Sequence, residues 1–177
     1  IDKGLIQEGT VLDLRLKYLG DKGVEYLSKC AKLLNLRELK LERNEITDKG
    51  IQFLAESTIL TNLKYLSLER NSIGDEGVRS ICLSPLFSHL TELNLWKNEV
   101  GSEGAKAIAD SLVLSKLQKL DLAKNKIGDD GGKALAESQT LTSLKYVDLF
   151  GNGISEETQG IIKESINFKN LQHLVLA

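Results

Sequence analysis

The sequence predicts an α/β fold, a right-handed solenoid or horseshoe with a parallel sheet on its concave face and helices on its convex face. Three observations lead to this prediction. Asparagines recur every 27 residues, at positions 44, 71, 98, 125 and 152. Each asparagine follows a leucine pattern of period two, which is typical of a short strand. Each also precedes apolar residues at i, i+3 and i+4, which are typical of a helix.

The strand half of the repeat is well defined. Residues 36–46 read LRELKLERNEI, and the same pattern returns without insertion or deletion in four further copies, at residues 63–73, 90–100, 117–127 and 144–154. Leucines alternate with polar residues, so each strand buries one face and exposes the other. A degenerate copy with Lys17 at the asparagine position precedes the five, and a seventh begins at residues 171–177. We therefore expect seven strands.

The helical half follows each asparagine. Gly50, Ile51, Leu54 and Ala55 form one apolar stripe, and equivalent stripes recur in the later copies. A short oxygen-bearing side chain stands just before each stripe, where it would accept hydrogen bonds from the unpaired N–H groups of that helix. These expected capping residues are Asp21, Asp48, Asp75, Ser102 and Asp129. Six helices of about ten residues are predicted.

Stacking of the repeats is obligatory because one unit cannot bury its leucines alone. Strands pack about 4.8 Å apart and helices about 8–10 Å apart, so the stack bends with its sheet on the inside. We expect one domain over residues 1–177, with about six repeats and a truncated repeat at each end. Residues 1–9 match the register of a helix end and loop at residues 28–36, and the chain stops on a strand at Ala177. The chain is therefore expected to be a fragment.

The motif L-x-x-L-x-L-x-x-N-x-I resembles that of leucine-rich-repeat proteins. The continuation G-D-E-G-V at residues 74–78, like G-D-D-G-G at residues 128–132, is followed by a helix and is similar to the ribonuclease-inhibitor type. The resemblance covers essentially the whole chain, although the 27-residue period is shorter than that of the inhibitors. Similar repeats occur in ribonuclease inhibitors, Ran GTPase-activating proteins, NOD-like receptors and bacterial proteins, some of which are delivered into host cells.

Composition excludes several functions. A formal charge of -2, from 23 basic and 25 acidic residues in 177, gives no excess for nucleic acid or anionic membranes. No apolar run approaches the ~20 residues of a membrane span. Cys30 and Cys82 fall in the first and third expected helices, about 16–20 Å apart, so both should be free thiols. We expect a cytoplasmic or otherwise intracellular location, which includes that of a bacterial effector secreted into a host cell.

Catalytic and metal sites are not expected. His89 and His173 occupy different registers with no Cys or second His beside them, and no phosphate-binding glycine loop is present. The acidic-glycine turns lack the alternating ligands of a calcium loop. The asparagines are expected to bind backbone groups of their own and the adjacent repeat. The sequence thus predicts no catalytic residue, no metal and no cofactor, and a protein that is not an enzyme.

The concave face carries the candidate binding residues. Its twenty outward positions in the five copies, which include Ser67 and Ala123, hold four of the chain's nine aromatic residues. Exposed aromatic residues on a rigid sheet are typical interface anchors. Basic residues at positions 43, 70, 97 and 124 share one register and should form a mutually repelling column. The predicted partner-binding residues are Tyr65, Glu69, Arg70, Trp96, Lys97, Lys124, Tyr146, Asp148 and Phe150.

The function that this pattern favours is a non-enzymatic interaction module that binds a partner protein across the concave face. One alternative, implied by the resemblance, is a GTPase-activating or other GTPase-regulating protein of the Ran-activator type. Another is a sensor or spacer array of a larger signalling or effector protein. An exposed terminal strand and its leucine layer also predict end-to-end self-association, because an unpaired strand edge favours pairing with another chain.

Overall fold

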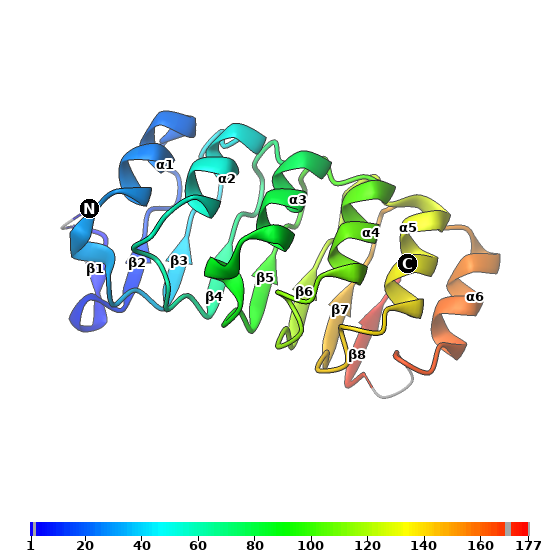
Figure 1. The fold of residues 1–177 in the computed structure, drawn as a ribbon. Helices are drawn as coiled ribbons and strands as arrows, with labels where there is room; N and C mark the ends of the chain where they lie inside the picture. The colour runs from blue at the N-terminus through cyan, green and yellow to red at the C-terminus, as the bar shows by residue number, and fades with distance from the viewer. Residues whose placement is uncertain (2, 169–170, 177) are drawn as a thin grey trace.

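The computed structural model describes residues 1, 3–168 and 171–176, so Ala177, the end of the seventh copy, lies outside the described residues. The described chain forms an open eight-stranded sheet in which the strands follow one another in sequence order, with six α-helices along one side (Figure 1). Seven parallel strands and six helices were predicted, and all of them are present. The α/β solenoid is confirmed.

The repeat sets the spacing of the elements. The parallel strands are β2 (Val11–Asp13), β3 (Glu38–Lys40), β4 (Tyr65–Ser67), β5 (Glu92–Asn94), β6 (Lys119–Asp121), β7 (Tyr146–Asp148) and β8 (His173–Val175). The α-helices are α1 (Gly20–Ser28), α2 (Asp48–Ala55), α3 (Asp75–Leu83), α4 (Ser102–Asp110), α5 (Gly128–Glu137) and α6 (Glu156–Glu164). Short 3-10 turns lie at η1 (Gln7–Gly9), η2 (Ala31–Leu33) and η3 (Pro85–Phe87).

An eighth strand, β1 (Leu5–Ile6), corrects the expectation for residues 1–9. It pairs antiparallel with β2, Leu5 opposite Leu12 and Ile6 opposite Val11, where a helix end and loop were expected. The chain reverses through Gln7, Glu8 and Gly9, whose φ angles are 49°, 57° and 84°. The hairpin gives β2 a partner on its outer edge.

The core is one continuous layer between the sheet and the helices. Leu39, Leu66, Leu93 and Leu120 are direct neighbours across β3 to β6 and are at most 2% exposed. Each buried leucine contributes about 2 kcal/mol of apolar burial. Because every strand adds a leucine to the same layer, the repeats stabilise one another and hold the sheet rigid.

The asparagines bind backbone groups of two repeats, as predicted. The Nδ2 of Asn98 donates to the carbonyl oxygens of Leu68 and Leu95, both at 3.0 Å, while its Oδ1 accepts the N–H of Ile73 at 3.1 Å. The Nδ2 groups of Asn71, Asn125 and Asn152 make equivalent bonds to a leucine carbonyl 30 residues earlier. This ladder satisfies polar groups in the turn after each strand, where the core would otherwise bury them unpaired.

The aspartates that were expected to cap their own helices act on the next repeat instead. Asp48 Oδ1 accepts the N–H of Gly74 at 2.7 Å, and Asp75 Oδ1 accepts that of Gly101 at 2.6 Å; these glycines stand at the N-caps of α3 and α4. The carboxylate lies so close to the following helix that a Cβ on Gly77 would come within 2.5 Å of Asp48 Oδ1. The aspartate and glycine columns therefore depend on each other.

Candidate functional site

The open sheet face is the side of the sheet opposite the helices, formed by the outward side chains of β3 to β7 and the residues that follow each strand. It is the concave face of the sequence prediction. All nine predicted binding residues belong to its strands or to the turns that follow them.

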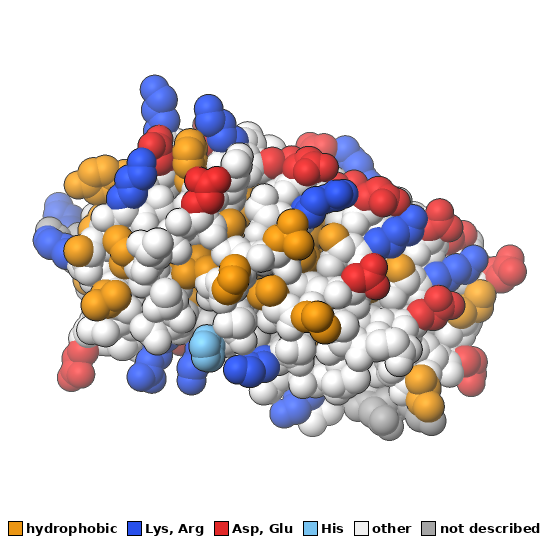
Figure 2. Space-filling model, in the orientation of Figure 1, with side chains coloured by type: hydrophobic (Ala, Val, Ile, Leu, Met, Phe, Trp, Pro, Cys, Tyr) orange, Lys and Arg blue, Asp and Glu red, His pale blue; other side chains and the backbone are white. Residues whose placement is uncertain are grey.

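The helix side of the molecule has a different character. Figure 2 shows acidic and basic side chains interspersed along the helices, with hydrophobic side chains dispersed among them. Tyr26 on α1 and Leu83 at the end of α3 are among the exposed apolar residues, at 71% and 73%. Apolar residues scattered singly are normal on protein surfaces and do not by themselves indicate a binding site.

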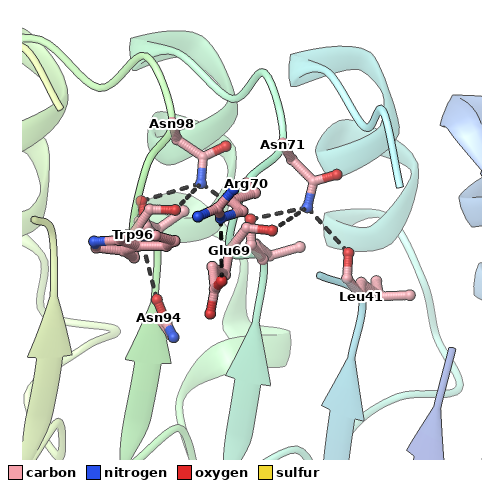
Figure 3. Close-up of polar contacts among 9 residues, drawn as sticks. Leu41, Glu69, Arg70, Asn71, Asn94, Trp96 and Asn98 are labelled. Carbon is pink, nitrogen blue, oxygen red and sulfur yellow. Dashed lines mark hydrogen bonds and ion pairs between the residues drawn. The ribbon is translucent and has the colours of Figure 1, made fainter. Parts of the chain in front are cut away.

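Trp96 is the centre of the first group on the open sheet face. Arg70 Cζ lies 4.6 Å from the centroid of the Trp96 ring, and Lys124 Nζ lies 5.5 Å from it. The two cations come from the repeats on either side of Trp96, so the negative faces of the ring attract both. Asn94 Oδ1 accepts the N–H of Trp96 at 2.8 Å and fixes the backbone beneath the ring (Figure 3). We call Arg70, Trp96 and Lys124 the Trp96 cluster.

The column of basic residues is arranged by the backbone. Arg43, Arg70, Lys97 and Lys124 have φ angles of 53–56°, the left-handed region, and Gly151 occupies the same register at 69°. Their N–H groups donate to the next repeat, as in Arg70 to the carbonyl of Trp96 at 2.9 Å. Glu69 Oε1 lies 3.6 Å from Arg70 Nε and offsets part of the positive charge. Arg70 and Lys124 also lie against the Trp96 ring, which attracts both charges.

Tyr146, Asp148 and Phe150 form a second group. The Tyr146 hydroxyl donates to Asp148 Oδ2 at 3.3 Å, and the N–H of Phe150 donates to Asp148 Oδ1 at 2.9 Å. The rings of Tyr146 and His173 lie with centroids 6.2 Å apart. Phe150 is 43% exposed, so its ring is available to a partner.

Tyr65 lies three strands from Tyr146, and a pocket separates the two tyrosines. Lys40 Nζ lies 5.8 Å from the centroid of the Tyr65 ring. Burial is the main cause of a raised pKa at both tyrosine hydroxyls. The pocket has a volume of about 250 Å³ and is lined by Tyr65, Glu92, Leu93, Asn94, Lys119, Asp121 and Tyr146.

Asp121 is the most perturbed carboxyl of this pocket. Burial raises its pKa from 3.8 to about 6, and the charges of Asp148 and Glu69 act in the same direction. One hydrogen bond opposes this effect, because Asp121 Oδ1 accepts the N–H of Ala123 at 3.0 Å. Asn94 and Asp148 accept the same backbone bond, from the N–H of the residue two positions later. Side chains at this position of the repeat therefore hold the backbone, whether or not they carry a charge.

The predicted binding residues thus fall into the Trp96 cluster with Glu69, the Tyr146 group, and the separate Tyr65; Lys97 is exposed in the basic column. Two of the outward positions were wrongly predicted to be exposed. Ser67 is fully buried and Ala123 is 2% exposed. Both side chains are short and stand in rows with much larger neighbours.

The pocket residues were only partly recognised from the sequence. Glu92, Lys119 and Asp121 are among the twenty outward positions of the sequence analysis, but they were not assigned to the site. The period-two pattern places them on the open sheet face, but only the structure reveals the pocket that they line.

The described residues contain no group of three His, Cys, Asp or Glu side chains that could hold a metal ion. Cys30 and Cys82 are free thiols, as predicted. Cys82 belongs to the core, and burial raises its pKa to about 12. Within the described ranges, no helix has the length and apolar character needed to cross a membrane.

Comparison with known proteins agrees with the repeat. Together the fold and the open sheet face define a repeat solenoid with one uncovered face. Residues 32–55, 60–82, 88–109, 113–136 and 140–157 match the family model described as "Leucine Rich repeat". These segments make up more than half of the chain, which therefore belongs to the leucine-rich-repeat family.

A solved structure supports the same fold. The chain is similar to an internalin from Listeria monocytogenes, with a TM-score of 0.62 and 24% sequence identity. The match covers 83% of this chain and 36% of the internalin chain, so it spans about a third of that solved chain. A search among curated protein sequences found no significant match.

Proposed function

We propose that this chain is a non-enzymatic protein-interaction module that binds a partner protein on its open sheet face. The observation that carries the proposal is the Trp96 cluster, in which a half-buried indole is held between two cations on a rigid sheet. Membership of the leucine-rich-repeat family supports an interaction role. Tryptophan, tyrosine and arginine are also the residues most enriched at binding hot spots.

Preorganisation favours the Trp96 cluster as an anchor. Arg70 and Lys124 restrain the ring before a partner arrives, so less side-chain entropy is lost on binding. Because cations lie close to the ring, a partner would contact mainly its exposed edge and the cationic groups. Phe150 offers a second apolar contact on a nearby repeat, and the adjacent Lys97 offers a charge that orients an approaching partner.

Photo-crosslinking tests which face binds. Phe150 and Tyr26 are replaced in separate variants by benzoylphenylalanine; Phe150 belongs to the open sheet face and Tyr26, 71% exposed, belongs to α1 on the helix side. We expect the partner to be captured at position 150 and not at position 26. Capture at position 26 alone would contradict the proposal.

The affinity test uses the partner identified in this way. The double variant Trp96→Ala, Phe150→Ala should bind it at least about a hundredfold more weakly, because each truncated hot-spot aromatic costs about 2 kcal/mol. Tyr26→Ala serves as the matched control and should bind like the unmodified chain. Circular dichroism should be the same for all three proteins. Unchanged affinity in the double variant would remove the open sheet face as the binding site.

Three finer points accompany this proposal. Each of the six strands β2 to β7 is followed by a helix of eight to ten residues. This regular helix supports the ribonuclease-inhibitor-like subtype, which stays a prediction. End-to-end self-association also stays a prediction, now through β8 because β1 pairs with β2; sedimentation at several concentrations tests it. An intracellular location is the third, and fractionation of the source cells tests it.

A further inference from the structure

The pocket between Tyr65 and Tyr146 holds a carboxylate that has no cationic partner among the described residues. Asp121 Oδ1 accepts the N–H of Ala123, whereas Oδ2 has no hydrogen-bond partner in the same part of the chain. The charged groups that act on Asp121 are Asp148 and Glu69, and both are acidic. A partly buried carboxylate in this position is expected to gain from a positive charge supplied from outside.

Lys119 lines the pocket, but an acidic residue already matches its charge. Lys119 Nζ, from the same strand as Asp121, lies 3.4 Å from Glu92 Oε2 on β5. Glu69, which follows β4, pairs with Arg70 at 3.6 Å. Each of these two cations therefore faces a carboxylate of its own, and neither forms an ion pair with Asp121.

Asp148 adds to the negative charge beside the pocket. It lies directly opposite Asp121, on the neighbouring strand β7. It accepts from the Tyr146 hydroxyl and from the backbone N–H of Phe150, but neither donor carries a charge. Asp121 in the pocket and Asp148 beside it therefore carry two negative charges with no ion-pair partner among the described residues.

The walls and size of the pocket also suit a long cationic side chain. Two tyrosines line it, and aromatic rings attract ammonium and guanidinium groups. A volume of about 250 Å³ is several times the ~30 Å³ of one water molecule, so there is room for a side chain. The backbone of β5 and β6 forms a regular parallel ladder below, with Asn94 opposite Asp121, so the floor is rigid.

We propose that this pocket receives an arginine or lysine side chain of the partner protein, whose cationic group binds Asp121. This inference rests on the proposed function, because it names the chemistry of the partner surface that docks on the open sheet face. The Trp96 cluster lies beyond the short side chains of Asn94 and Asp121 along the same strands, so one partner surface can reach both.

The test uses N-acetyl-arginine amide as the probe and N-acetyl-citrulline amide as its neutral isostere. Binding to the whole chain is followed at pH 7 by amide chemical shifts in NMR titrations. We expect the arginine probe to bind saturably, with the largest shifts in β4 to β7, and the citrulline probe to bind about tenfold more weakly. The same ratio should hold for N-acetyl-lysine amide against N-acetyl-glutamine amide.

Asp121→Asn is the decisive variant. The chain already uses asparagine at this register, since Asn94 Oδ1 accepts the N–H of Trp96, so the substitution removes the charge and keeps the backbone contact. It should weaken the arginine probe about tenfold and leave the citrulline probe unchanged. In the unmodified chain, binding should also weaken between pH 7 and pH 5 as Asp121, whose pKa is about 6, takes up a proton.

Asp13→Asn is the matched control. Asp13 occupies the same register on β2, four strands from Asp121, and its side chain pairs with Arg15 outside the pocket. The substitution removes the same charge from the same sheet face, and it should leave the binding of both probes unchanged.

The outcomes separate this inference from the proposed function. Equal binding of the charged and neutral probes, or equal binding of the arginine probe to Asp121→Asn and the unmodified chain, would overturn the cation pocket. Neither result alters the crosslinking experiment. Conversely, capture of the partner at position 26 alone would remove the proposed function and leave saturable probe binding as a property of the pocket.

Discussion

Asn98→Ala tests the physical basis of the solenoid. The substitution removes one bond to each of the carbonyls of Leu68 and Leu95, but Asn71 Nδ2 still donates to the first and Asn125 Nδ2 to the second. The N–H of Ile73 loses Asn98 Oδ1 and is left buried without a partner. Two shared bonds at about 0.5–1 kcal/mol each and one orphaned donor at about 1–3 kcal/mol predict a loss of about 3 kcal/mol.

Urea denaturation followed by circular dichroism measures this loss. Domains of this size are stable by about 5–15 kcal/mol, so a loss of about 3 kcal/mol lowers the midpoint clearly. The control is Asn62→Ala, an exposed asparagine that donates one bond to the carbonyl of Leu34. It should cost less than about 1 kcal/mol. Equal losses in the two variants would refute the assignment of the asparagine ladder as a main source of cohesion between repeats.

Three further predictions concern the helix contacts, the pH dependence and the thiols. Gly77→Ala should lower the free energy of unfolding by about 1–3 kcal/mol, because the added Cβ meets Asp48 Oδ1 at 2.5 Å; thermal melting that matches the unmodified chain would contradict this. Because the folded pKa of Asp121 is raised from 3.8 to about 6, the folded state binds the proton more tightly, and stability should fall as pH rises from 4 to 6. Urea midpoints measured across this pH range should fall less in Asp121→Asn than in the unmodified chain. Identical pH profiles of the two proteins would argue against this role of Asp121. Cys82, with a pKa of about 12, should resist iodoacetamide at pH 8 while the half-buried Cys30 reacts; mass spectrometry that finds Cys82 modified first would disprove this order.

Much of the fold could be predicted because its determinants are local and periodic. The leucine alternation around Leu39 placed β3, and the same spacing placed the other parallel strands. The structural role of the asparagines also followed from their position in the turn after each strand. β1 could not be predicted in this way, because its pairing with β2 depends on a reversal at residues 7–9 and on no repeated pattern.

The candidate site could be predicted only as a face. Alternation placed Trp96, Tyr146 and Asp121 on the same side of the sheet, but it contains no information on which side chains meet. The contacts of Trp96 with Arg70 and Lys124 run to the repeats on either side. The role of Asp48 was missed for the same reason, since its acceptor bond reaches the following repeat.

The sequence by itself determined the repeat, the order of strands and helices, and the face on which each outward residue lies, because these depend on periods of two, of about 3.6 and of 27 along one chain. The tertiary structure alone decided that Trp96 lies between two cations and that Ser67 is buried. It also decided that Asp121 lines a pocket and has no cationic partner of its own among the described residues. Those properties depend on side-chain size and on distances across neighbouring strands, which periodicity does not encode.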